Sequence, residues 1–201
     1  MRIKLLTILF CLSITALQAQ YFGIRGGFNF TSASVDIEGL DVETGNEGNL
    51  MIGLFLDLPV STDFLSVQPE INYMGRGYNS EAEIGNAEIK SSLAYLDIGG
   101  LVKLNFGTDQ PVSFYVGAGP FFNYALSGTV TDVAGERDVD FEADRIRRSE
   151  LSVAAAAGVN LNNFFVEVRY MGSLSNQSDE DEVDVSQRSI GINGGFRVPL
   201  F

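Results

Sequence analysis

The stretch FFVEVRYMGSL, residues 164–174, has an apolar side chain or glycine at every second position. Successive side chains of a β-strand point to opposite faces. One face then carries Phe164, Val166, Val168, Tyr170, Gly172 and Leu174. The other face is mixed and includes Glu167 and Arg169. This pattern predicts a strand with one face in apolar surroundings, as in a sandwich, a soluble barrel or a membrane barrel.

The same alternation recurs along the chain, and no apolar face contains a charge. We expect eight strands, near residues 21–33, 49–58, 64–77, 92–106, 112–126, 149–161, 164–174 and 188–201. Their connections alternate in length. The short ones lie near 59–63, 107–111 and 162–163, and the long, polar, acidic ones near 34–48, 78–91, 127–148 and 175–187.

Short turns on one side and long loops on the other are typical of an outer-membrane barrel with both termini on the periplasmic side. The sequence therefore predicts an all-β fold, an eight-stranded antiparallel up-and-down transmembrane β-barrel. A soluble barrel of lipocalin type is the alternative. It would turn the same apolar faces inward around a lipophilic ligand.

The first 20 residues, MRIKLLTILFCLSITALQAQ, have the pattern of a secretory signal peptide. Arg2 and Lys4 form a basic start, an apolar stretch follows, and small Ala19 precedes the expected cleavage site. We therefore expect a signal peptide over 1–20 and an outer-membrane β-barrel domain over 21–201. Cys11 is the only cysteine, so the mature chain has no thiol chemistry.

The chain is strongly acidic, with 13 Lys and Arg against 26 Asp and Glu and a formal charge of −13. Removal of residues 1–20 leaves 11 bases, hence a mature charge of −15. This charge argues against nucleic acid as a partner. The four long connections hold 19 of the 26 acids.

The polar faces of the strands carry ten balanced charges. The acids are Asp57, Glu70, Asp97, Glu150 and Glu167, and the bases are Arg25, Arg76, Lys103, Arg169 and Arg197. A packed interior needs such balance, because an unpaired buried charge costs several kcal/mol. We expect these ten residues to form a charge network in the lumen. Candidate partners of Arg169 on other strands are Glu150, Asp97 and Glu70.

The polar faces also carry aromatic side chains, at Phe55, Tyr95, Tyr115, Phe121 and Phe165. These favour a filled lumen. Enzymatic activity is not expected, because lipases, acyltransferases and proteases of such barrels generally need a His as general base, and the chain has none. The acidic run SDEDEVDVS (178–186) lacks the glycine and ligand spacing of a calcium loop. We expect no cofactor and no metal site.

Five segments resemble the PorT-like outer-membrane barrel domain family: GIRGGFNF (23–30), VQPEINYMGRGY (67–78), YLDIGGLVKLNF (95–106), FYVGAGPFFNYAL (114–126) and the final Phe201. The resemblance covers the mature chain. It implies an eight-stranded barrel inserted by the outer-membrane assembly machinery, which reads a C-terminal aromatic residue, here Phe201. It implies no activity.

The function expected from the sequence is a structural or surface-interaction role, with a plugged, charge-balanced lumen and acidic extracellular loops. The expected partners are outer-membrane lipid and lipopolysaccharide. Divalent cations bridging the acidic loops to lipopolysaccharide phosphates, or direct contacts from Arg145, Arg147 and Arg148, would serve such binding. The alternative function is a transport or binding barrel for a small ligand. No specific protein partner follows from the sequence.

Overall fold

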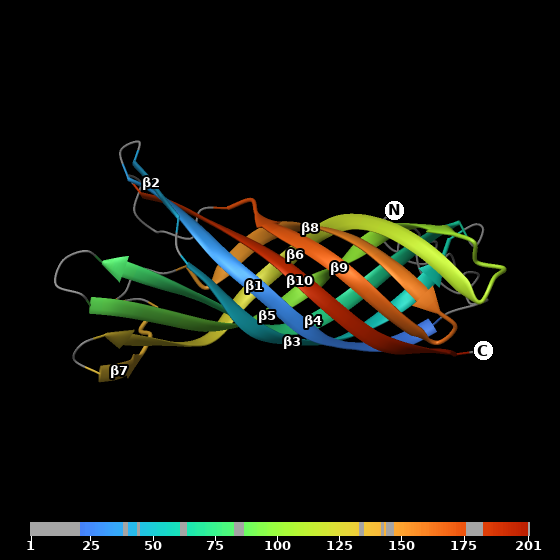
Figure 1. Cartoon of the computed structure of the whole chain (residues 1–201), viewed down its shortest axis with the longest axis horizontal. Helices are drawn as coiled ribbons and strands as arrows, with labels where there is room; N and C mark the ends of the chain where they lie inside the picture. Colours follow the sequence, from blue (N-terminus) through green and yellow to red (C-terminus); the bar gives the residue numbers. More distant parts are fainter. Residues whose placement is uncertain are drawn as a thin grey trace, which may run out of the picture.

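Eight long strands form the wall of a closed antiparallel β-barrel in the computed structural model (Figure 1). The structure describes residues 21–37, 40–43, 45–60, 64–82, 87–132, 135–141, 143, 147–175 and 183–200. The wall strands are β1 Tyr21–Ile37, β3 Gly45–Pro59, β4 Leu65–Ala82, β5 Ala87–Phe106, β6 Val112–Asp132, β8 Ser149–Leu161, β9 Phe164–Ser173 and β10 Val183–Pro199. Each wall strand pairs with the next, and β10 pairs with β1 from Tyr21↔Pro199 to Ile37↔Val183. This closure confirms the predicted fold class.

The two ends of the barrel differ. At one end, which we call the terminal end, lie the start of β1, the end of β10 and the three short turns (Figure 1). Asn162 N–H donates to the Pro111 carbonyl at 3.0 Å, which ties two of these turns together. Asn162 and Gly107 have φ angles of 56° and 71°. This left-handed region suits Asn and Gly, and it lets the chain reverse within a few residues. The opposite end, which we call the loop end, carries the four segments that were predicted as long connections.

The prediction that residues 34–48, 78–91, 127–148 and 175–187 are loops was wrong over much of their length. β4 and β5 stay paired to Ala82↔Ala87, and β1 stays paired with β10 to Ile37. Two short strands, β2 Leu40–Glu43 and β7 Gly135–Asp138, pair with β1 and β6. Backbone pairing needs no apolar side chain, so the strands continue past the point where the hydrophobic alternation ends.

The apolar faces of the wall strands point outward and the polar faces point inward. Phe28 is 59% exposed, Ile52 63% and Val168 52%, whereas Asn29, Asn72 and Asn193 are buried. An apolar belt of this size around the whole barrel requires lipid. The lipocalin-type alternative, which needs the reverse facing, is therefore wrong. Within the described ranges, no helix is long and apolar enough to cross a membrane. The predicted signal peptide (1–20) and Phe201 lie outside the described residues.

Candidate functional site: the lumen charge network

The ten charged residues expected on the polar faces all lie on the inner side of the wall. Nine of them are buried, and the Arg197 side chain is 14% exposed. They gather into three groups along the lumen. We call them the loop-end triad (Arg76, Asp97, Glu150), the central quartet (Arg25, Glu70, Glu167, Arg169) and the terminal-end triad (Asp57, Lys103, Arg197). Their formal charges are −1, 0 and +1, so the lumen is neutral overall but polarised along its axis.

The central quartet is a ring of alternating charge built from β1, β4 and β9. Arg25 contacts Glu70 at 2.9 Å and Glu167 at 3.2 Å. Arg169 contacts the same two carboxylates at 2.8 and 2.9 Å. Of the three candidate partners of Arg169, the structure selects Glu70 and leaves Asp97 and Glu150 to Arg76. Because each of the four groups contacts two groups of opposite charge, the charges of the ring cancel across the lumen.

Aromatic side chains fill the space around the quartet. The guanidinium of Arg25 lies 4.7 Å from the centroid of the Phe55 ring, and Phe55 packs edge-on against Phe165 at 5.4 Å. The Tyr115 hydroxyl donates to Glu167 Oε2 at 2.7 Å. These contacts join cation–π attraction to ion pairing. Tyr115 was expected inside the barrel, but its bond to Glu167 was not foreseen. The only signal in the sequence was that Tyr115 lies on the inner, polar face of its strand.

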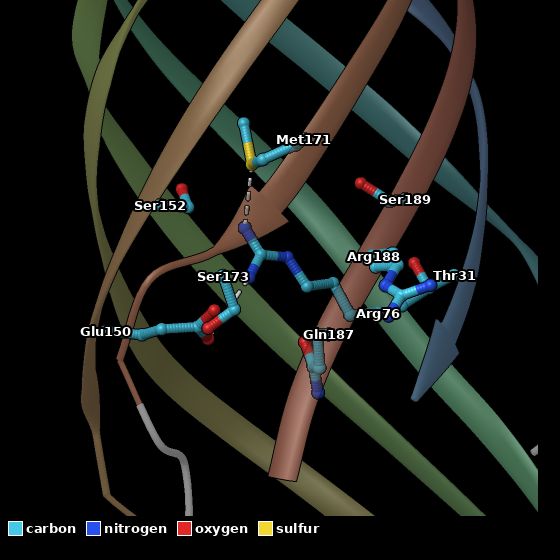
Figure 2. Close-up of a pocket in the computed structure, with 9 residues that line it drawn as sticks. All are labelled: Thr31, Arg76, Glu150, Ser152, Met171, Ser173, Gln187, Arg188 and Ser189. Carbon is cyan, nitrogen blue, oxygen red and sulfur yellow. Dashed lines mark hydrogen bonds and ion pairs between the residues drawn. The ribbon is translucent and has the colours of Figure 1, made fainter. Parts of the chain in front are cut away.

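The loop-end triad is centred on Arg76 of β4. Arg76 Nη2 donates to both Asp97 oxygens at 3.1 and 3.0 Å, and Nη1 donates to Glu150 Oε2 at 3.4 Å. Figure 2 shows the Arg76 guanidinium between Glu150 and Met171, whose sulfur accepts from Nη2 at 3.3 Å. The remaining cavity has room for about 10 Å³, which is about one water molecule. The lumen is therefore closely packed at this level.

An apolar cluster above this triad was missed by the sequence analysis. Val139 and Phe141 follow β7 and pack against inward-facing Leu93, Tyr95 and Ala125. Val139 N–H donates to the Gly128 carbonyl at 2.9 Å, which holds this segment against β6. Their period-two spacing within an acidic stretch was the available signal. The segment adds an apolar layer to the filling at the loop end.

The terminal-end triad shares one carboxylate between two cations. Lys103 Nζ donates to Asp57 Oδ2 at 2.7 Å and to Gln68 Oε1 at 2.8 Å. Arg197 Nη1 lies 3.7 Å from the same Asp57 oxygen, beyond hydrogen-bonding distance. Gln68 is buried on the inner face of β4, two residues before Glu70, and its bond to Lys103 was not foreseen. This end of the lumen therefore carries an excess positive charge on Arg197.

Chemically, these groups are buried ion pairs at three levels of the lumen. Within the part of the chain that the structure describes, no three Asp or Glu side chains lie together as a metal site would require. The carboxylates of the central quartet are each held by two arginines and so are engaged in structural pairing.

Comparisons with known proteins agree with this architecture. Residues 18–179 match the family described as outer membrane protein beta-barrel domain. Among solved structures, the outer membrane protein OprG from Pseudomonas aeruginosa is similar, with a TM-score of 0.53 and 15% identity, and the match covers 90% of this chain and 96% of that chain. Ail from Yersinia pestis, in complex with the heparin analogue sucrose octasulfate, has a TM-score of 0.46 and 16% identity, covering 89% of this chain and 99% of that one.

The likeness to OprG shows the fold alone, because the identity is low. No curated protein sequence matches the chain significantly. The family match spans most of the chain and includes the first seven of the eight wall strands, β1 to β9. This chain belongs to the outer membrane protein β-barrel domain family.

Proposed function

We propose that this outer-membrane barrel has a structural or surface-interaction role and does not conduct. The observation that carries the proposal is the central quartet. Its four charges and the aromatic rings around them occupy the middle of the lumen, and all of them are buried. A barrel of eight strands has an interior just wide enough for its own side chains. An ion pathway would have to displace at least four ion pairs.

The part of the molecule left for interaction is the loop end. We propose that it faces outward from the cell and that the terminal end faces the periplasm. The short turns at the terminal end and the long, acidic strand extensions at the loop end support this orientation. The four long connections carry 19 acids, and β7 is fully exposed. Arg147 and Arg148 are exposed near the start of β8. We propose that these groups meet lipopolysaccharide, the arginines directly and the acids through divalent cations.

Three further proposals concern export and assembly, membership of the PorT-like family, and the absence of catalysis. Residues 1–20 are proposed to be removed on export, and Phe201 to be read by the assembly machinery. The five quoted segments support a place among PorT-like barrels. The absence of His from the sequence supports a role without catalysis.

A planar-bilayer recording of the purified protein tests the closed lumen. We expect no steady conductance. A stable, large single-channel current would overturn the proposal and favour transport of a small solute instead.

Surface labelling of intact cells tests the orientation. A tag inserted within 175–187 should be accessible from outside, and a tag at Asn162–Asn163 should not. The reverse pattern would refute the proposed topology without affecting the closed lumen.

A further inference from the structure

The lumen is not filled at the terminal end. A cavity of about 260 Å³ lies there, and its lining includes Asp57, Ser66, Asn105, Ser113, Asn160 and Arg197. Exposed Thr108, in the turn between β5 and β6, also lines it, so the cavity reaches the mouth of the barrel. This volume is slightly below the range of about 300–1,000 Å³ that is usual for small-molecule sites. It holds much more than one water molecule.

Arg197 gives this cavity a positive charge. Its nearest carboxylate oxygen, Asp57 Oδ2, is already bonded to Lys103 at 2.7 Å. Arg197 Nε is buried and has no hydrogen-bond acceptor among the described residues. Buried donors in native proteins are nearly always paired, and a guanidinium pairs best with a carboxylate or phosphate. The excess charge and the unused donor both point to an anionic ligand.

Two serine hydroxyls provide further donors. Ser66 Oγ accepts from Asn105 Nδ2 at 3.0 Å, and Ser113 Oγ accepts from Asn160 Nδ2 at 3.1 Å. A hydroxyl that accepts one hydrogen bond still has its own proton to donate. Each serine is therefore held in place by an amide and can donate to a ligand in the cavity.

Asp57 adds a requirement of the opposite kind. Its Oδ1 atom is buried and has no donor among the described residues. A simple anion would leave this oxygen unpaired and would be repelled by it. A ligand with a hydroxyl next to its anionic group would satisfy Asp57 Oδ1 and Arg197 together.

From these contacts we propose that the terminal-end cavity binds a small hydroxylated oxyanion of single negative charge. Arg197 and the two serines hold the anionic group, and Asp57 accepts from the neighbouring hydroxyl. A free hydroxy acid has this chemistry, and so does the glycerol-phosphate headgroup of an anionic lipid. The site goes beyond the proposed surface role and does not depend on it.

Calorimetric titration of the full barrel in nanodiscs of zwitterionic lipid tests the site, with D-glycerate as the probe and uncharged glycerol as its control. We expect saturable binding of D-glycerate and none of glycerol. Arg197→Gln should weaken D-glycerate binding at least about tenfold, which is about 1.4 kcal/mol. Arg188→Gln, the same charge change on an exposed residue near the loop end, should leave binding unchanged. A gel comparing boiled and unboiled samples shows that each variant is folded.

Ser113→Ala keeps the test valid if Arg197→Gln does not fold, and it should weaken binding about threefold. A second titration in nanodiscs containing phosphatidylglycerol separates the two sources. Competition there would identify a lipid headgroup, and unchanged affinity a free solute. The proposal is overturned if wild-type protein shows no saturable binding up to about 10 mM, where a ligand of millimolar affinity would be bound. Equal binding by wild type and the folded Arg197→Gln or Ser113→Ala variant would also overturn it, since the D-glycerate would then be bound outside this cavity.

Discussion

Arg169 and Glu70 are 99 residues apart in the sequence and form a two-pronged ion pair across the lumen. Arg169 Nη1 donates to Glu70 Oε1 at 2.8 Å, and Nη2 donates to Oε2 at 3.2 Å. The side chain of Glu70 is fully buried and that of Arg169 is 4% exposed. The pair links β9 to β4, which are not neighbours in the wall. It therefore braces the barrel from within, in addition to the backbone pairing around it.

Arg169→Ala should lower the free energy of unfolding by about 3–5 kcal/mol, because it leaves two buried carboxylates to share a single arginine, Arg25. Urea unfolding of the refolded barrel measures this change. Arg188→Ala, at an exposed residue near the loop end, is the control and should stay within about 0.5 kcal/mol of wild type. A similarly small loss for Arg169→Ala would mean that water enters the lumen and solvates the carboxylates.

Val168→Arg should destabilise the barrel by about 2–4 kcal/mol, because Val168 lies on the outer face in the middle of β9. The arginine would have to enter the apolar layer of the membrane. Val60→Arg is a matched control at an exposed apolar residue in a terminal-end turn, and we expect a change of at most about 1 kcal/mol. Folding titrations into lipid vesicles provide both values. Equal effects at the two sites would show that Val168 does not face lipid.

The facing of the wall strands could be predicted from sequence because it depends on a local period of two. The neighbours Val168 and Arg169 show this, since one is exposed and the other buried. The choice of ion-pair partners could not be predicted in the same way. Arg76 pairs with Asp97 on the adjacent strand, whereas Arg169 reaches across the lumen to Glu70. These choices depend on the stagger of the closed barrel, which no single strand encodes.

The filling of the loop end was beyond the sequence analysis for a different reason. Phe141 lies in an acidic stretch, and only the closed barrel creates the apolar surface of Leu93 and Tyr95 against which it packs. The extension of the strands past the end of the hydrophobic alternation was missed because backbone pairing leaves no hydrophobic pattern. The terminal-end cavity could not be predicted either, since it depends on side-chain volumes that meet only after closure.

Gly119→Ala should destabilise the barrel by about 1–3 kcal/mol through overpacking. A Cβ atom at Gly119 would overlap the carbonyl oxygen of Gly100 on β5, so the two strands would have to separate. Gly26→Ala is the matched control, because a Cβ there meets only the Met51 carbonyl oxygen, at an ordinary 3.7 Å. Urea unfolding of both variants measures the difference. Identical urea midpoints for the two variants would mean that β5 and β6 can separate at this point at little cost in free energy.

Tyr115→Phe isolates the hydrogen bond between a lumen aromatic and the central quartet. The substitution keeps the ring and removes the hydroxyl that donates to Glu167 Oε2 at 2.7 Å. A hydrogen bond to a buried charge contributes about 1.5–3 kcal/mol, so we expect a loss of that size in the free energy of unfolding. Tyr170→Phe, the same change at a residue that is 43% exposed on the outer face, should shift stability by no more than about 0.5 kcal/mol. Equal, small losses in the two variants would show that water replaces the Tyr115 hydroxyl, and the central quartet would then be hydrated and poorly suited to block conduction.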